Sequence, residues 1–118
     1  MKAFTNLEQS CKLAEILPLE SADMFYHYNV GIKSYYEDAP RVIQVNNHFT
    51  FFHRDIPCWS LAALLSVLEH PRCFQGDKPT YWFCGCFDKD KLYHEVEADN
   101  PVDACVEMIL KLYKLNLL

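Results

Sequence analysis

Glycine is scarce in this sequence and a long apolar run is missing, and both absences restrict what the chain can be. Only 3 of the 118 residues are glycine, so long flexible linkers are not expected. The longest strongly apolar stretch, residues 61–68, is far too short to cross a bilayer as a helix. The first residues also lack the apolar segment of a secretory signal peptide. The sequence therefore predicts a cytoplasmic protein with no membrane partner.

Basic residues are too few and too scattered for a nucleic-acid surface. The 11 lysines and arginines stand against 16 aspartates and glutamates, which gives a net charge of −5. Proteins that bind nucleic acids usually carry a basic patch or stripe, so we expect no nucleic-acid partner. The length of 118 residues and the hydrophobic fraction of 51% fit one globular domain, residues 1–118, with its own core.

The sequence has 6 cysteines, namely Cys11, Cys58, Cys73, Cys84, Cys86 and Cys105. An even number would suit disulfides in a secreted protein, but a reducing cytoplasm favours free thiols. Free cysteine behaves as a small hydrophobic residue and is often buried. Packed structural thiols are therefore the first interpretation of these residues.

Two helices are predicted in the first 70 residues. The first spans residues 5–17, because Thr5 and Glu8 have capping-box spacing and Pro18 ends the pattern. Its expected apolar line is Leu7, Cys11, Ala14 and Leu17. The second spans residues 58–69, with Ser60 among its candidate N-caps. Apolar residues surround it, which predicts a central helix buried in the core or, alternatively, shared with a second subunit.

The segment between these helices favours extended structure. Residues 23–36 are rich in aromatic residues, and Asn29 and Gly31 mark a turn. Residues 41–45 and 48–52 predict a tight hairpin around two asparagines, which tolerate the positive φ of two-residue turns. Beyond the second helix, His70–Pro71–Arg72 indicates a helix end and residues 75–79 a loop.

A second hairpin is predicted from residues 81–87 and 92–98, joined by the polar turn Asp88–Lys91. A turn of two or four residues pairs Gly85 with His94. The core face would then consist of Tyr81, Phe83, Gly85, Phe87, Leu92, His94, Val96 and Ala98. The opposite face would carry Trp82, Cys84, Cys86, Tyr93, Glu95 and Glu97.

A helix with clear start signals follows this hairpin. Asn100 is the predicted N-cap, and Pro101 takes the first helical position, where its missing N–H is harmless. The expected buried stripe is Val102, Cys105, Val106, Ile109, Leu112 and Tyr113. Together the elements predict an α+β fold of order α-ββ(β)-α-ββ-α, in which about three helices pack on a single antiparallel sheet.

Two helix-forming blocks carry a family resemblance. Residues 57–65, Pro-Cys-Trp-Ser-Leu-Ala-Ala-Leu-Leu, and residues 99–109, Asp-Asn-Pro-Val-Asp-Ala-Cys-Val-Glu-Met-Ile, cover about a fifth of the chain. They resemble a group of small uncharacterised proteins encoded in prophages and other mobile elements of gut bacteria. The resemblance implies a bacterial, cytoplasmic, phage-related setting. It implies no activity, cofactor or functional residue.

Two places in the second hairpin offer chemistry. Cys84 and Cys86 lie on one side of a strand and are candidate ligands of a soft metal, with His70 and Cys73 as a second pair. Structural zinc sites usually space paired cysteines by two to four residues, so packed thiols remain the favoured interpretation and no metal is predicted. Gly85 leaves room above the sheet, where His94 could meet a ligand or fill the space itself.

Interaction residues are expected on two segments. The tyrosines Tyr26, Tyr28, Tyr35 and Tyr36 suit a protein interface, because tyrosine buries much area at little entropic cost. The apolar residues Leu115, Leu117 and Leu118 either pack on the fold or contact a partner. No catalytic residue and no cofactor are predicted. The favoured function is a small non-enzymatic accessory protein that binds another protein or itself. The alternative is a small-molecule or metal-binding protein, even an enzyme, built on His94, Cys84 and Cys86.

Overall fold

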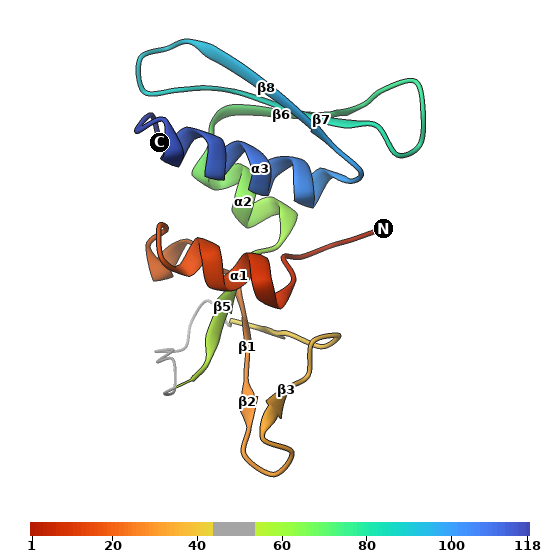
Figure 1. Ribbon diagram of the computed structural model, residues 1–118, viewed down its shortest axis with the longest axis vertical. Helices are drawn as coiled ribbons and strands as arrows, with labels where there is room; N and C mark the ends of the chain where they lie inside the picture. Colours follow the sequence, from red (N-terminus) through yellow and green to blue (C-terminus); the bar gives the residue numbers. More distant parts are fainter. Residues whose placement is uncertain (44–53) are drawn as a thin grey trace.

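The computed structural model describes residues 1–43 and 54–118 and has an α+β architecture (Figure 1). The elements in chain order are α1 (Leu7–Ala14), the short 3₁₀ helix η1 (Leu19–Ser21), β1 (Met24–Tyr26), β2 (Tyr28–Asn29), β3 (Ser34–Tyr35), β4 (Arg41–Val42), β5 (Ile56–Cys58), α2 (Leu61–Val67), β6 (Glu69–Gln75), β7 (Trp82–Phe87), β8 (Tyr93–Ala98) and α3 (Pro101–Lys114). The predicted fold class is confirmed.

The strands form three antiparallel sheets in the described residues, where one sheet was predicted. Their orders are β4-β1-β5, β2-β3 and β6-β7-β8. Strands β1 to β5 are only two or three residues long, so none extends far enough to join the longer strands at the other end of the molecule (Figure 1). The predicted turn near Asn29 and Gly31 is confirmed, because it joins β2 to β3. Most of the hairpin predicted at 41–52 lies outside the described residues; its first residues, β4, pair with β1.

Helix α3 begins as its local sequence predicts and lies on one face of the sheet β6-β7-β8 (Figure 1). The Asn100 side chain accepts a hydrogen bond from the Asp103 N–H, and Pro101 is the first helical residue. The predicted stripe is buried apart from Tyr113, which is 55% exposed because it lies on the solvent side near the helix end. The core also contains Leu13, Leu64 and Trp59, contributed by α1, α2 and the residue after β5.

Helix α1 is shorter than predicted and uses a different cap. Its N-cap is Asn6, which forms a reciprocal capping box with Gln9. Thr5 has another partner: its hydroxyl accepts a hydrogen bond from the Trp59 N–H. The helix therefore turns Leu13 inward and leaves Cys11 exposed, contrary to the predicted apolar line. Helix α2 is buried on one side, with Ser60 as its N-cap as the sequence indicated.

Strand β6 was not predicted. Pro71 indicated only the end of the preceding helix, but the proline lies at a β-bulge of an edge strand, where a missing N–H is tolerated. The β6–β7 pairing places Cys73 beside Cys84 and Phe74 beside Phe83. These contacts follow from a strand that the sequence did not indicate.

The register of β7 and β8 differs by one residue from the prediction. The turn has five residues, and Phe87 pairs with Tyr93, Cys86 with His94 and Cys84 with Val96. An odd-length turn keeps β8 as predicted but reverses the faces of β7. Consequently Cys84 and Cys86 point into the core, whereas Phe83, Gly85 and Phe87 lie on the outer face.

A buried carboxylate explains the five-residue turn. Asp88 Oδ1 accepts hydrogen bonds from the N–H groups of Asp90 and Leu92, and the Asp88 N–H donates to the Leu92 carbonyl. Lys91 has a φ of 67°, which closes the loop in the left-handed region. The turn is therefore organised by a side chain that polarity alone would place in solvent.

Candidate functional site

The four tyrosines predicted to form one interaction surface lie in different environments. Tyr26 is only 1% exposed and its hydroxyl donates to the Thr5 carbonyl, so it is a core residue and not part of a surface. Tyr28 and Tyr35 pack edge to face with ring centroids 5.3 Å apart across the β2–β3 hairpin. Tyr36 lies in the following loop and is exposed.

The leucines that follow α3 also behave differently from one another. Leu117 packs against the core, its N–H donates to the Leu112 carbonyl, and its own carbonyl accepts from Lys89. Leu115 and Leu118 are exposed. Of the two predicted alternatives, packing on the fold describes Leu117.

His94 and Gly85 do not form the predicted gap. The observed register places them on opposite faces of the sheet, because His94 pairs with Cys86. The His94 Nε2 lies 2.6 Å from Asp88 Oδ2. Above Gly85 there is no free space, because an added Cβ would lie 1.9 Å from the Tyr93 hydroxyl oxygen. The Tyr93 ring fills the space that the glycine leaves.

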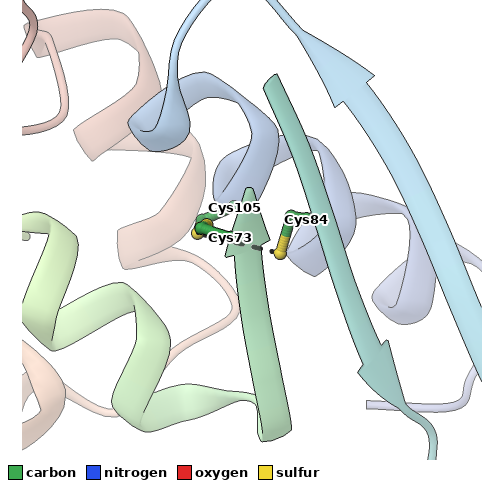
Figure 2. A group of neighbouring side chains, drawn as sticks. All are labelled: Cys73, Cys84 and Cys105. Carbon is green, nitrogen blue, oxygen red and sulfur yellow. Dashed lines mark hydrogen bonds between the residues drawn. The ribbon is translucent and has the colours of Figure 1, made fainter. Parts of the chain in front are cut away.

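Three cysteines meet beneath the sheet (Figure 2). Cys73 on β6, Cys84 on β7 and Cys105 on α3 form a group that we call the thiol cluster. The Sγ atoms of Cys73 and Cys105 are 3.5 Å apart, those of Cys105 and Cys84 are 3.8 Å apart, and all three lie within 4.8 Å of one another. Cys84 and Cys105 are completely buried, and Cys73 is partly buried.

The pKa values of the three thiols are shifted in different directions. Hydrogen bonds with Cys105 and Cys84 lower the pKa of Cys73. The contact with Cys105 lowers the pKa of Cys84, but its hydrogen bond to Cys73 and its burial outweigh that effect and raise it. Hydrogen bonds to Cys73 and Cys84, together with burial, raise the pKa of Cys105.

Sequence reasoning named two members of this cluster, Cys84 and Cys73, as metal-ligand candidates but missed the arrangement. It identified Cys84 but paired it with Cys86, which lies on the same side of β7 yet outside the cluster. Its second candidate pair joined Cys73 to His70, which lies outside the cluster, and it placed Cys105 in the buried stripe of α3. The signal that could have indicated the β6–β7 hairpin was the turn-like loop 76–81, with Gly76 and Pro79, between two segments able to pair as strands.

The outer side of the sheet β6-β7-β8 carries an aromatic surface. Phe74 stacks on Phe83 with ring centroids 5.1 Å apart, and Phe87 packs edge to face on Tyr93 at 5.5 Å. We call these four residues the aromatic face. Phe87 is 37% exposed and Tyr93 is 43% exposed. The helices that pack on this sheet, α2 and α3, lie on its other side (Figure 1).

A cationic pocket lies at the opposite end of the molecule, beside the β2–β3 hairpin. Its described lining is His27, Tyr28, Val30, Lys33, Arg41, Arg54 and Asp55. The Arg54 guanidinium lies 4.6 Å from the Tyr28 ring centroid, and His27 Nδ1 is 2.9 Å from Asp55 Oδ1. This basic grouping was not visible in the sequence.

Comparisons with known proteins add no identity to this description. No protein-family model, no curated protein and no solved structure matches the chain. The resemblance to phage-related proteins of gut bacteria therefore stays a prediction. Across the described residues, every helix is too short or too polar to span a lipid bilayer.

Proposed function

We propose that this is a small binding protein without catalytic activity, and that its partner is a second copy of the chain, bound through the aromatic face. The observation that carries the proposal is the grouping of Phe74, Phe83, Phe87 and Tyr93 on the side of the sheet away from α2 and α3. Aromatic residues are enriched at the centres of protein interfaces. A cytoplasmic, phage-related setting remains part of the proposal.

The two edges of this sheet are poorly suited to self-association. If β8 paired antiparallel with β8 of a second copy, the exposed Glu95 and Glu97 would lie close to the glutamates of that copy. Like charges would then meet across the new pair of strands. On β6, Pro71 and the bulge interrupt the row of free backbone groups. The face of the sheet, and not its edge, is therefore the surface open to a second copy.

Two charged residues that share the outer side of the sheet with the aromatic face, Arg72 and Glu95, complement those of a second copy. Arg72, Gly85 and Glu95 form one row across the three strands. If a twofold axis parallel to the strands relates two such sheets, this row lies over the same row of the second copy, with the order of its residues reversed. Arg72 of each copy would then lie over Glu95 of the other, with the two Gly85 positions at the centre. Opposite charges that meet across an interface favour that register over others.

The small size of the face favours a weak interface. Strands of six or seven residues at about 3.3 Å per residue, spaced about 4.8 Å apart, make a face roughly 20 Å by 14 Å. Two such faces bury less than the roughly 1,600 Å² of a standard interface. We therefore expect a weak, concentration-dependent dimer with strands aligned within about 30°.

Sedimentation velocity and light scattering test the proposal over roughly a hundredfold range of protein concentration up to about 1 mM, where weak interfaces become populated. The expected result is a monomer–dimer equilibrium. Arg72→Glu should weaken it about tenfold or more, because it places two acidic groups together. The double variant R72E/E95R should restore it.

Arg41→Glu is the matched control, because it makes the same charge change on β4, in another sheet. It should leave the equilibrium unchanged. A protein that stays monomeric at the highest concentration contradicts self-association through this face. A dimer that responds equally to R72E and R41E contradicts it as well.

A further inference from the structure

We propose that Cys73, Cys84 and Cys105 form a binding site for one soft, thiophilic metal ion. The three residues come from β6, β7 and α3, so the site would tie the last helix to both strands of a hairpin. Nothing in the aromatic face is required for this site, which lies on the other side of the sheet (Figure 2).

The distances between the sulfur atoms suit a metal centre. Metal–sulfur bonds of about 2.3 Å place the sulfurs of a tetrahedral or trigonal site roughly 3.7–4.0 Å apart. The observed separations are 3.5 Å and 3.8 Å, and the third is within 4.8 Å. Movements of less than about 1 Å would bring all three into this range. A disulfide would need a sulfur pair at about 2.05 Å and would leave the third thiol unused.

The composition of the donor set selects the class of metal. The cluster contains three sulfur atoms, and no imidazole or carboxylate group belongs to it among the residues that the structure describes. Sulfur-only sites favour Zn²⁺, Cu⁺ and related soft ions over Mg²⁺ or Ca²⁺, which prefer oxygen ligands. Three protein ligands leave a fourth position for an external ligand or suit an ion that takes three.

The electrostatic environment requires a cation before the thiols can all ionise. Cys84 and Cys105 are completely buried, and several thiolates in one apolar place would repel one another without compensation. Binding is a ligand exchange: three S–H bonds release three protons to solvent, and three metal–sulfur bonds replace bonds between the ion and water, without transfer of electrons. A divalent ion would leave one net negative charge and a trivalent ion none.

The partly buried Cys73 marks the side from which an ion would enter. Its strand β6 is the edge of the sheet, so a small movement there opens the cluster without separating β7 from β8. The three cysteines come from separate elements, so they lie close together only in the folded chain. Binding therefore stabilises the folded protein by mass action, to an extent that grows with metal concentration.

Titration of the reduced protein with Cd²⁺, and separately with Zn²⁺, tests the site. We expect saturation at one ion per chain, a thiolate-to-cadmium absorption band in the ultraviolet, and a higher unfolding temperature. Mg²⁺ should produce none of these changes. Each of Cys73→Ala, Cys84→Ala and Cys105→Ala should lower the affinity for Cd²⁺ at least tenfold.

Cys86→Ala is the matched control, because Cys86 is completely buried, lies on the same strand two residues from Cys84 and faces the same side. It should keep the affinity of the unchanged protein. Cys11→Ala and Cys58→Ala provide further controls. Circular dichroism confirms that each variant is folded before its affinity is compared.

Alkylation of the unmutated protein gives a readout that does not depend on variants. Bound Cd²⁺ should slow the modification of Cys73, Cys84 and Cys105, located by peptide mass mapping, and leave Cys11 unaffected. Absence of saturable Cd²⁺ uptake overturns the proposal. Uptake that survives in C84A and C105A, or protection that falls on other cysteines, overturns it too.

Discussion

The two faces of the sheet β6-β7-β8 differ in what they contact and in what they can do. The inner face carries the small residues Cys84 and Cys86, which leave space for α3 to lie close to the strands. The outer face carries the four aromatic-face residues, whose rings pack in pairs and remain partly exposed. The difference shows that on β7 the small residues Cys84 and Cys86 lie on the packed side, whereas the rings of Phe83 and Phe87 lie on the open side.

A lysine placed on each face in turn is the strongest way to break this comparison. Cys86→Lys would bury an unpaired ammonium group beneath α3, which costs several kcal/mol and unfolds a marginally stable domain. The neighbouring Phe87→Lys would point to solvent and should cost about 1 kcal/mol or less. Urea denaturation followed by circular dichroism, at low protein concentration, measures both. Similar losses for the two variants would contradict the assigned faces.

The Asp88 turn, which sets these faces, offers an intermediate effect with a defined pH dependence. Burial raises the pKa of Asp88, but hydrogen bonds from His94, the Leu92 N–H and the Asp90 N–H outweigh it, so the pKa lies below its ordinary 3.8. A depressed carboxyl pKa contributes stability above the unfolded value and loses it as the pH falls through the folded value. Asp88→Asn should therefore be less stable than the unchanged protein at neutral pH.

The difference between D88N and the unchanged protein should shrink as the pH drops below about 3.8, the pKa of an ordinary aspartate. Thermal unfolding at a series of pH values measures it. The titratable side chains beside Asp88 are His94, which bonds to it, and Cys86, whose own pKa is raised by burial and then by Asp88. Asp90→Asn serves as the control, because only its backbone joins the turn. A constant difference at all pH values would contradict this role.

The contact between Gly85 and Tyr93 gives the smallest predicted effect and sharpens the description of the outer face. Gly85→Ala would place a methyl group against the Tyr93 hydroxyl, which also donates to Glu95. Tyr93 can swing away, so the expected loss is about 1 kcal/mol. In a Tyr93→Ala background the same change should be neutral or slightly stabilising, since alanine fits a strand better than glycine. Equal losses in both backgrounds would contradict the contact.

Much of the last third of the chain could be predicted because its signals are local. The start of α3 depends on Asn100 and Pro101 alone, and a cap acts over one turn of helix. The cap of α2 at Ser60 is equally local. In contrast, Thr5 had the spacing of a cap but bonds to Trp59, more than fifty residues away, so the cap passed to Asn6. A distant partner overrode the local preference.

The candidate sites were harder to predict than the elements. The thiol cluster joins residues 32 and 21 positions apart, and it required strand β6, which Pro71 concealed. The aromatic face required the correct register of β7. The error in the faces of β7 has a simple origin: strand side chains alternate with a period of two, so one additional residue in a turn exchanges the faces.

The sequence by itself determined where helices α2 and α3 begin, that a hairpin precedes α3, and that the glutamates of β8 face solvent. These features follow from interactions between residues a few positions apart. The tertiary structure alone decided which side of β7 faces the core and that Cys73, Cys84 and Cys105 meet there. Those outcomes depend on the buried Asp88 carboxylate and on packing between remote segments, and residue spacing contains no record of either.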